Sequence, residues 1–495
     1  MTTSSLQQRD KSDKRASVAI DLGAESCRVS LLRWVGSDEE AEPEVTLIHR
    51  IPNGPVFDAG AGPNGELRWP LDRILVGLEE GLRKAAEAAP EGIRSLAVDG
   101  WAVDYVRLGP DGQPLALPFC YRDVRSEASK ARVDELIAPE EFFAQTGAQP
   151  LRINTVYQLL ADNAAEISPG TPWLLLPEFV LSWLGGRRVA EYTNATHTGL
   201  VDIETGDWSR PIFDRLGLWV EAAPEIVPTG TILGRLRGPL AKLPAFADTI
   251  LIAPACHDTA SAIAAITEDL SHTAYIVSGT WSLVGTVVDA PIITAEAEHA
   301  GFTNQGAGAG GYCFHTNVNG MWVLKQCMDH WCGEGRDIDL VTLIAQAAEV
   351  TEIPGVIDVD APQLMLGGRM PERLNEELLN AGLLAIPDVA GNEPVFARTI
   401  FASLASRYAT VLRNLETHTG RSFQKITILG GGSRNALLSR LTEESTGLPV
   451  SAGEAEGSTL GNFAVQMATL EQNPISPAQV RGWAERLTTA TLAKR

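Results

Sequence analysis

Residues 19–32 read AIDLGAESCRVSLL, in which two runs of strand-forming residues flank a turn that contains Gly23. We predict a strand over residues 17–20, a glycine turn, and a second strand over residues 28–34 that pairs back on the first. The same theme returns past the middle of the chain, where residues 275–287 read YIVSGTWSLVGTV. This repeat of strand, glycine turn and strand indicates two similar domains, joined near residues 265–273.

Helical and strand patterns alternate through both halves, which is typical of an α/β fold. Predicted helices cover residues 71–89, most of 130–185, 259–267, 399–415, 435–445 and 458–470. Predicted strands cover residues 93–98, 103–108, 115–120, 249–253, 274–277, 281–287 and 426–429. We expect a disordered extension over residues 1–15, a first domain over 16–270, a second domain over 271–482 and a tail over 483–495.

The composition restricts the partners of the chain. Its 495 residues carry 40 Lys and Arg against 62 Asp and Glu, a net charge of −22. An acidic surface repels nucleic-acid backbones and anionic lipid, so we expect neither as a partner. Residues 1–15 lack the apolar core of a signal peptide, and the apolar run at 173–184 is too short to span a bilayer. Six cysteines without a CxxC pair indicate free thiols and no zinc site, so we expect a cytoplasmic protein.

Three glycine-rich turns are candidate ligand sites. Asp21 ends the first strand beside the amides of its turn, an arrangement that holds hydrated Mg²⁺ and phosphate oxygens, although a plain hairpin has the same pattern. The run Gly430, Gly431 and Gly432 lies between a strand and a helix, where a nucleotide can approach the backbone. Residues 306–311 satisfy GxGxxG, but an extended segment follows, so we expect a loop or hairpin there. The chain has no GxxxxGK[ST] motif.

The best acid–base candidate is Asp258, in the segment CHDT of residues 256–259, at a strand end that leads into a helix. The helix N-terminus favours the ionised carboxylate, which is the form that accepts a proton from a sugar hydroxyl. A simple helix cap has the same sequence pattern. The segment SGT at residues 278–280 offers a hydroxyl and free amides to a phosphate that moves towards Asp258.

Aromatic and charged residues gather at two further strand ends, where residues 99–104 read DGWAVD and residues 121–125 read YRDVR. Aromatic rings stack on sugar faces, and Asp and Arg bind hydroxyls, so this region predicts a sugar site. Trp101 by itself also fits a core position. Neither HExxH nor GxSxG occurs, so zinc hydrolase and serine hydrolase chemistry have no support.

Taken together, these segments resemble the FGGY carbohydrate kinases, and within that family the rhamnulokinase branch. The resemblance runs in order from about residue 17 to residue 470. HDTASA, SGTWSL and YTNAT are the segments most specific to that branch, whereas the GGG turn is shared across the superfamily. The matching segments are AIDLGAESCRVSLL, AVDGWAVDYVRL, FCYRDVRS, RINTVYQL, EYTNATHTGLVDIETGDW, HDTASAIAAI, VSGTWSLVG, FTNQG, TNVNGMWVLKQ and ILGGGSRNALLSRLTEESTGLPVSAGEAEGSTLGN.

The resemblance implies two actin-like (ribonuclease-H-like) ATPase domains that flank a deep cleft. It implies ATP and Mg²⁺ as co-substrate and cofactor, and transfer of the γ-phosphate to the O1 hydroxyl of L-rhamnulose in rhamnose catabolism. The products are then L-rhamnulose 1-phosphate and ADP. The implied partners are a small ketose and ATP, with the chain as a monomer or homodimer.

The resemblance also assigns residues to roles. Asp258 is the implied general base, and Asp21 the implied Mg²⁺ ligand, through water. The implied sugar contacts are Trp101, Ala102, Asp104, His257, Asp258 and Thr259. The implied ATP contacts are Ala24, Glu25, Ser26, Cys27 and Arg28 in the first phosphate loop, followed by Thr280, Asn317, Lys325, Gly431 and Gly432.

The chain departs from the family pattern at three places. Ala102 stands where the family usually has Gly beside the sugar, and Lys325 stands where it usually has Gln beside ATP. The loop AESCR is bulkier than usual and is expected to place Glu25 and Cys27 beside the phosphates. L-Fuculose and L-xylulose therefore stay open as substrates. A non-catalytic sugar or nucleotide sensor is a further alternative, but it normally carries a helix–turn–helix extension or a basic face.

Overall fold

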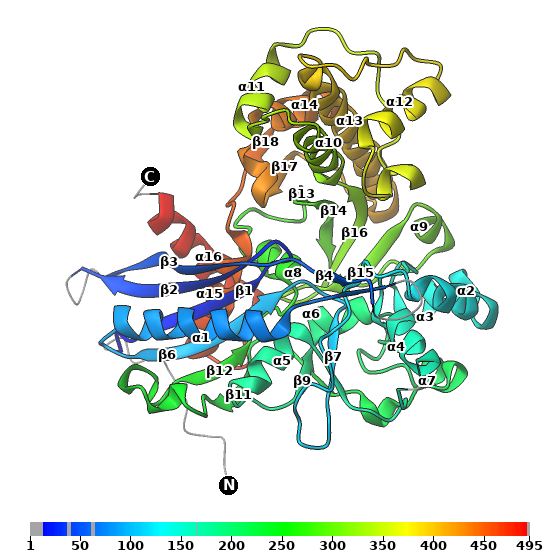
Figure 1. Ribbon diagram of the computed structural model, residues 1–495. Coiled ribbons are helices and arrows are strands. Elements are labelled where there is room, and N and C mark those ends of the chain that lie inside the picture. The colour runs from blue at the N-terminus through cyan, green and yellow to red at the C-terminus, as the bar shows by residue number, and fades with distance from the viewer. Residues whose placement is uncertain (1–12, 37–40, 61–64, 166, 493–495) are drawn as a thin grey trace.

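The computed structural model describes residues 13–36, 41–60, 65–165 and 167–492. Two six-stranded mixed sheets dominate it. One lies in the first body, the lower one in Figure 1, and the other lies in the second body, the upper one. The first sheet has the order β11-β12-β6-β1-β2-β3, and the second has the order β15-β16-β14-β13-β17-β18. The strands of the first are β1 (Ala16–Leu22), β2 (Ser26–Val35), β3 (Glu42–Pro52), β6 (Ile93–Gly100), β11 (Thr231–Arg235) and β12 (Ile250–Ala253). Those of the second are β13 (Thr273–Ser278), β14 (Trp281–Val288), β15 (Phe302–Gly306), β16 (Tyr312–Asn319), β17 (Lys425–Leu429) and β18 (Val450–Ala452).

The two sheets repeat one plan, which confirms the two-domain α/β prediction. In each, a central strand pairs antiparallel with the next strand and that strand with a third, giving β1-β2-β3 and β13-β14-β16. On its other side the central strand pairs in parallel with a later strand, and that strand pairs in parallel with a further one, giving β1-β6-β12 and β13-β17-β18. All seven residues of β1 are buried, because helices cover both faces of a parallel centre.

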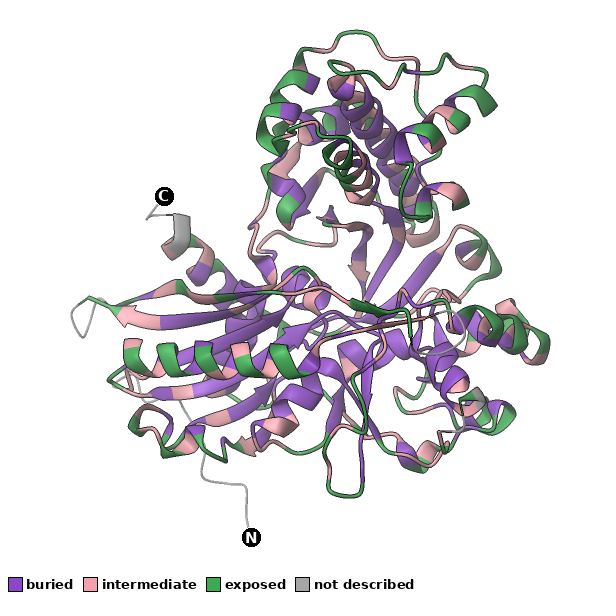
Figure 2. Cartoon of the chain, in the orientation of Figure 1, coloured by how far each residue is buried: buried purple, intermediate pink, exposed green. Residues whose placement is uncertain are grey.

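Amphipathic helices cover the sheets. In α1 (Leu71–Ala88), buried residues recur every three or four positions, and the helix packs against β2 and β3. Figure 2 shows the outer face of α1 exposed and the central strands β1 and β13 buried, whereas the edge strand β3 is mostly exposed or half-buried. In the upper body, the long helix α13 (Glu393–Thr419) packs against α14 (Ala436–Thr446), α11 (Leu340–Glu349) and α10 (Trp322–Gly333), and α12 (Met370–Asn380) packs against α10. Helix α9 (Ala295–His299) lies apart from this group, against β15.

The lower body carries an added layer between β7 (Tyr105–Arg107) and β10 (Glu225–Val227). It contains α2 (Ser126–Leu136), α3 (Pro139–Thr146), α4 (Thr155–Ala164), β8 (Trp173–Leu175), α5 (Leu176–Trp183), β9 (Val189–Glu191), α6 (Tyr192–Ala195) and α7 (Arg210–Leu216). This layer has an apolar cluster of its own around Phe142, Tyr157 and Trp173. The strand predicted over residues 115–120 does not form: only Phe119 makes an isolated bridge, to Arg68, and Leu115 and Leu117 are exposed.

The end of the chain returns to the first body. After β18, α15 (Gly457–Glu471) packs on α8 (Asp258–Ala264), β1 and β6, and α16 (Pro477–Leu492) packs on β3 (Figure 1). Gln466 on α15 donates from Nε2 to the carbonyl of Val18, 3.0 Å away, and accepts from the Ser95 hydroxyl at 2.6 Å. The segment predicted as a tail instead continues α16 to Leu492, since apolar residues such as Trp483 are buried there.

Of the extension predicted over residues 1–15, residues 1–12 lie outside the described part, and Arg15 pairs with Asp13. The GxGxxG segment forms the hairpin between β15 and β16, as predicted. Among the described residues, no helix is both long enough and apolar enough to cross a membrane.

Candidate functional site

Three carboxylates meet where the strands of the first sheet end. Asp21 on β1 and Asp99 on β6 are partners in the parallel register, and Asp258 begins α8 just after β12. The carboxyl ends of parallel strands lie on one edge of a sheet, and this edge faces the second body. The Asp258 side chain is 34% exposed and that of Asp21 is 4% exposed, so Asp258 is the carboxylate that a substrate can reach.

Each carboxylate has different partners. Arg28 Nη1 and the Ser458 hydroxyl both donate to Asp21 Oδ2, each at 2.7 Å. Asn462 Nδ2 donates to Asp99 Oδ2 at 2.6 Å, and Asp99 Oδ1 is buried without a hydrogen-bond partner. The Thr259 amide donates to Asp258 Oδ1 at 2.5 Å.

Burial raises the pKa of Asp258, although hydrogen bonds from Thr259 and the charge of Arg28 act against it. Burial likewise raises the pKa of Asp21 and lifts the pKa of Asp99 well above its usual value, and the mutual repulsion of the carboxylates adds to both. The predicted stabilisation of ionised Asp258 by its helix is therefore outweighed by the loss of water. A divalent cation held through water would relieve this repulsion, and carboxylate oxygens, one of them buried and unpartnered on Asp99, are the hard donors that Mg²⁺ prefers.

The first predicted phosphate loop lies beside these carboxylates. A Cβ on Gly23 would lie 2.4 Å from the carbonyl oxygen of Ser26, so only glycine fits this turn. Glu25 projects from the turn, and the Thr280 hydroxyl on the second body donates to its carboxylate at 3.4 Å. The two glycine turns of the repeated theme therefore face each other across the two bodies.

The thiol of Cys27 does not lie beside the phosphates, so that expectation is wrong. Successive strand residues point to opposite faces, and Cys27 is the buried one between Ser26 and Arg28. Its side chain joins the apolar core, and burial raises its pKa to about 12. Arg28 points the other way, towards Asp21 and Glu456.

The glycine run of the second body packs tightly on the other turn. A Cβ on Gly432 would lie 2.1 Å from Ser278 Oγ, whereas one on Gly431 would meet nothing within 4 Å. Gly431 therefore leaves backbone open to a ligand. Asn317 on β16 pairs in register with Leu283 next to this edge. Lys325 on α10 is exposed and its ammonium lies 2.9 Å from Asp329 on the same helix.

The predicted sugar residues divide into two groups. Asp104 is fully buried, and its carboxylate accepts hydrogen bonds from Trp69 Nε1, Trp101 Nε1, the Tyr121 amide and Gln158 Nε2. No exposed oxygen remains for a sugar, so we correct Asp104 from a substrate ligand to a positioning residue. Burial raises its pKa to about 6.

The other predicted sugar residues are near neighbours in the chain of Asp104 or of Asp258. The ring of Trp101 packs against the ring of Trp69, with the ring centres 4.4 Å apart, and this contact fixes the plane of the Trp101 ring. Ala102 follows directly, and Val103 takes a left-handed φ of 70° that brings the chain back to Asp104. His257 and Thr259 flank Asp258.

The sequence reasoning missed a chain of neutral histidines that joins the two bodies. The Tyr275 hydroxyl lies 2.9 Å from His315 Nδ1, and His315 Nε2 lies 2.6 Å from Gln305 Oε1. Gln305 Nε2 then donates to His197 Nδ1 at 2.7 Å, and the His197 ring lies 3.8 Å from the His257 ring. Burial lowers the pKa of His257 and of His315 to about 3, and lowers that of His197 well below its usual value.

These contacts set the direction of the hydrogen bonds in the chain. His197 Nδ1 accepts, so its Nε2 carries the proton, and this buried donor has no partner beside His257. Nothing in the segment EYTNATHTGL marks His197, because its role depends on Gln305, 108 positions away. Asp99 likewise depends on a distant partner, Asn462, 363 positions away.

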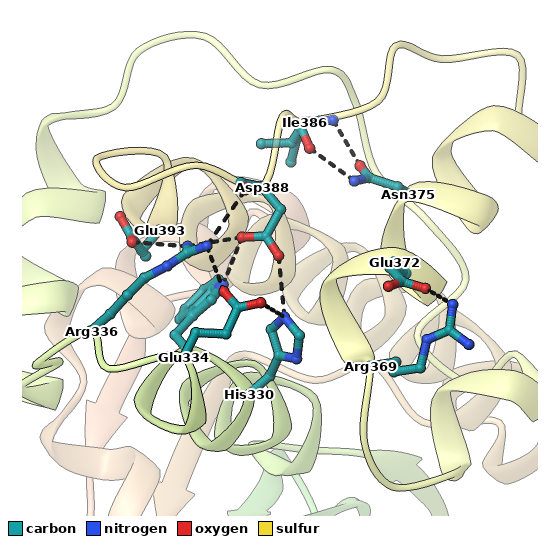
Figure 3. A network of polar contacts seen from close by, with 10 residues as sticks. His330, Glu334, Arg336, Arg369, Glu372, Asn375, Ile386, Asp388 and Glu393 are labelled. Atoms are coloured by element: carbon teal, nitrogen blue, oxygen red, sulfur yellow. Dashed lines mark hydrogen bonds and ion pairs between the residues drawn. The ribbon is translucent and has the colours of Figure 1, made fainter.

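His330, Glu334 and Asp388 also gather, on the upper body (Figure 3). Arg336 already binds both carboxylates, at 2.8 Å from Asp388 Oδ1 and 2.8 Å from Glu334 Oε2. It also reaches Glu393, at the start of α13. The cluster is therefore an ion-pair network that fastens α10 to α13.

Comparisons with known proteins agree with this geometry. Residues 17–265 match the N-terminal domain of the FGGY family of carbohydrate kinases, and residues 274–470 match its C-terminal domain. A ligand-bound xylulose kinase from Lactobacillus acidophilus is similar in structure, with a TM-score of 0.74 at 16% identity over 97% of both chains. Gluconate kinase from the same organism has a TM-score of 0.71 at 15% identity, over 97% of this chain and 98% of that one. Plasmodium falciparum glycerol kinase with ADP has a TM-score of 0.74 at 13% identity, over 96% of this chain and 93% of that one.

At these identities the structural neighbours show the fold alone, which is the two-domain α/β fold of the actin-like ATPase type. The family matches cover most of the chain and both bodies, and they imply a phosphotransferase that uses ATP and acts on a sugar. Paired carboxylates at one sheet edge, opposite two glycine turns, suit that chemistry. The chain belongs to the FGGY family of carbohydrate kinases.

Proposed function

We propose that this protein is a rhamnulokinase, which transfers the γ-phosphate of ATP to the O1 hydroxyl of L-rhamnulose and releases L-rhamnulose 1-phosphate and ADP. The observation that carries the proposal is the placement of the three segments most typical of that branch: two of them touch each other beside Asp258, and the third touches the first phosphate loop. The His257 amide, in HDTASA, lies 3.3 Å from the Thr193 hydroxyl, in YTNAT. Thr280, in SGTWSL, meets Glu25 of the loop beside Asp21.

Asp258 is the proposed general base. Its Oδ1 is held by the Thr259 amide, which leaves Oδ2 for the substrate hydroxyl. As the O1 oxygen bonds to the γ-phosphorus and the bond from phosphorus to the bridging oxygen of ADP breaks, the O1 proton passes to Asp258. The raised pKa of Asp258 makes its carboxylate a stronger base than an ordinary aspartate.

The remaining residues bind and orient the two substrates. Gly431 leaves room for the nucleotide at the backbone, and the turns at residues 23–26 and 278–280 offer amides to its phosphates. Mg²⁺, held by Asp21 and Asp99 through water, would supply charge neutralisation on the phosphates. Closure of the two bodies would exclude the water that competes with the sugar hydroxyl. The proposed sugar domain is residues 16–270, and the proposed nucleotide domain is residues 271–482.

Trp101, Ala102 and His257 form the proposed sugar wall. Because Ala102 adds a methyl group where the family usually has glycine, another ketose such as L-fuculose or L-xylulose is the second candidate. These sugars differ in the groups that would meet that methyl.

The test is an ADP-release assay with L-rhamnulose, L-fuculose, L-xylulose and D-xylulose, each at several concentrations. We expect the highest kcat/KM for L-rhamnulose. A higher kcat/KM for another ketose would make that ketose the proposed substrate. If no ketose raised the rate of ADP release above the rate with ATP alone, the kinase proposal would be refuted.

Asp258→Asn tests the base. We expect turnover to fall by about 10²–10⁴-fold, while ATP affinity measured by calorimetry stays within about twofold. Asp248→Asn, which alters an exposed aspartate paired with Arg235, is the matched control and should keep full activity. Near wild-type turnover in Asp258→Asn would show that another group takes the proton.

A further inference from the structure

A cavity of about 260 Å³ lies in the first body, away from the site described above. It is enclosed by β7, the loop of residues 115–119, Arg125 at the start of α2, and α4. None of the residues that we assign to ATP, Mg²⁺ or the sugar lines it. The cavity is therefore distinct from the site of phosphoryl transfer.

The wall of this cavity holds more positive than negative charge. Arg107 Nε lies 2.8 Å from Asp162 Oδ2, and Arg125 Nη1 lies 2.6 Å from Asp162 Oδ1. The side chains are only 7% exposed for Arg107, 15% for Arg125 and 2% for Asp162. Two guanidinium groups thus share one carboxylate, which leaves about one positive charge without a counter-ion in a buried place.

Two hydrogen-bond donors on these arginines are unused. Arg107 Nη2 and Arg125 Nε are both buried and have no hydrogen-bond partner. The other nitrogens are occupied: Arg107 Nη1 donates to the Thr171 carbonyl at 2.6 Å, and Arg125 Nη2 to the Tyr105 hydroxyl at 3.4 Å. An unpaired buried donor on a charged group is costly, so the two donors and the extra charge call for an anion.

The rest of the lining is apolar and partly open to solvent. Leu115 and Leu117 at the rim are 55% and 41% exposed. Phe119 lies between two guanidinium groups, with Arg68 3.7 Å and Arg125 3.6 Å from its ring centre. Arg68 is already neutralised by Glu66 at 2.6 Å, so Arg107 and Arg125 supply the charge.

We propose that this cavity binds a small organic anion, a phosphate monoester or a carboxylate with an apolar body. The acidic group pairs with Arg107 and Arg125, and the apolar body packs against Phe119, Leu115 and Leu117. Two guanidinium groups can donate hydrogen bonds to the two oxygens of a carboxylate or to the terminal oxygens of a phosphate monoester.

The cavity is linked to the proposed sugar wall through Gln158. Gln158 lines the cavity, and its Nε2 donates to Asp104 Oδ1 at 3.1 Å and contacts the Val103 carbonyl at 3.3 Å. Asp104 in turn holds Trp101. An anion held beside Gln158 would act on the hydrogen bond that holds Asp104, so the proposed ligand is an effector of sugar binding. This second step rests on the proposed sugar site.

The test is calorimetric titration of the full-length protein with phenyl phosphate and with benzoate, in saturating ADP and Mg²⁺ so that the nucleotide site is filled. Benzyl alcohol, which has a similar body without the charge, should bind at least about tenfold more weakly. Arg125→Gln removes one donor, and Ala116→Trp fills the cavity from an exposed position. Each variant should weaken phenyl phosphate by at least about tenfold.

Arg132→Gln is the matched control, because Arg132 lies on α2, is exposed and does not line the cavity. It should bind phenyl phosphate like the wild type. The proposed anion site would be refuted if neither anion bound, or if both cavity variants bound phenyl phosphate as tightly as the wild type. The unpartnered donors of Arg107 and Arg125 would then be hydrogen-bonded to water. Circular dichroism confirms that each variant is folded, and Ala116→Trp keeps the test valid if Arg125→Gln unfolds.

Coupling is measured separately, as the KM for the sugar with and without phenyl phosphate. We expect that KM to change at least about threefold in the wild type and not in Ala116→Trp, while the KM for ATP stays constant. Binding with an unchanged sugar KM would overturn the effector role. The binding result does not depend on the identity of the sugar, so failure of the proposed substrate is distinguishable from failure of this site.

Discussion

The contact between Gly432 and Ser278 gives a sharp test of how the two glycine turns of the second body fit together. An added Cβ at position 432 would lie 2.1 Å from Ser278 Oγ and 2.4 Å from its Cβ, but 3.3 Å from its carbonyl oxygen. Gly432→Ala therefore collides with a side chain and not with the main chain. Replacing that side chain as well, in Gly432→Ala with Ser278→Gly, removes both close contacts.

The magnitude follows from overpacking. Both positions are buried, so the turns must separate, at about 2 kcal/mol. For a folding unit of 150–250 residues, this lowers the Tm by about 4–8 °C. Ser278→Gly alone loses about 0.5–1 kcal/mol through backbone freedom. We expect the double variant to lose at least about 1 kcal/mol less than the sum of the two single losses, which is the coupling expected between two residues in contact.

The assay is thermal unfolding by calorimetry, with ADP affinity measured in parallel. Gly431→Ala is the matched control, since its Cβ meets nothing within 4 Å, and its Tm should stay within about 1 °C of the wild type. A Tm for Gly432→Ala equal to that of Gly431→Ala would refute the packing. So would a double variant whose losses simply add.

Three further predictions rest on buried groups. Burial lowers the pKa of His315 to about 3, so its neutral form is favoured in the folded protein, and stability rises with pH between about 3 and 6.5. His315→Gln should reduce that slope by up to about 1.4 kcal/mol per pH unit in urea unfolding between pH 5 and 6, and an unchanged slope would contradict its burial as a neutral ring. Cys332 is exposed, whereas Cys27 is buried and burial raises its pKa to about 12. Iodoacetamide at pH 8 should therefore modify Cys332 first, as followed by mass spectrometry. Early labelling of Cys27 would instead place its thiol in the cleft. Asp104→Asn should raise the sugar KM by about tenfold or more while the ATP KM stays constant. The Asn amide has one acceptor oxygen and one NH2 donor, so its NH2 must face either Gln158 Nε2 or the tryptophan donors, which disturbs the position of Trp101. Equal changes in both KM values would point to general unfolding.

Local pattern was enough to predict the elements. The apolar strand β1, the turn at Gly23 and the amphipathic helix α1 are each specified by residues close together in the chain, through side-chain periodicity and turn chemistry. The repeat of that strand–turn–strand theme also predicted two similar bodies, and the two sheets share their topology. The strand predicted at 115–120 failed because strand formation needs a partner, which local pattern does not provide.

The sequence predicted many residues of the candidate site, but not how their side chains are oriented or which of them are in contact. Asp21 and Asp258 were predicted from their places at strand ends. The direction of the Cys27 side chain and the saturation of Asp104 by four donors were not, because strand parity and side-chain contacts are set only when the elements pack.

The sequence by itself determined the α/β class, the two-domain repeat and the residue types of a sugar kinase, since these depend on local periodicity and short motifs. Only the tertiary structure decided which groups meet. Asn462 and Ser458 reach Asp99 and Asp21 across 363 and 437 positions of the chain, because α15 returns to the first sheet. Such contacts arise from sheet register and helix packing between distant segments, and no local stretch of sequence records them.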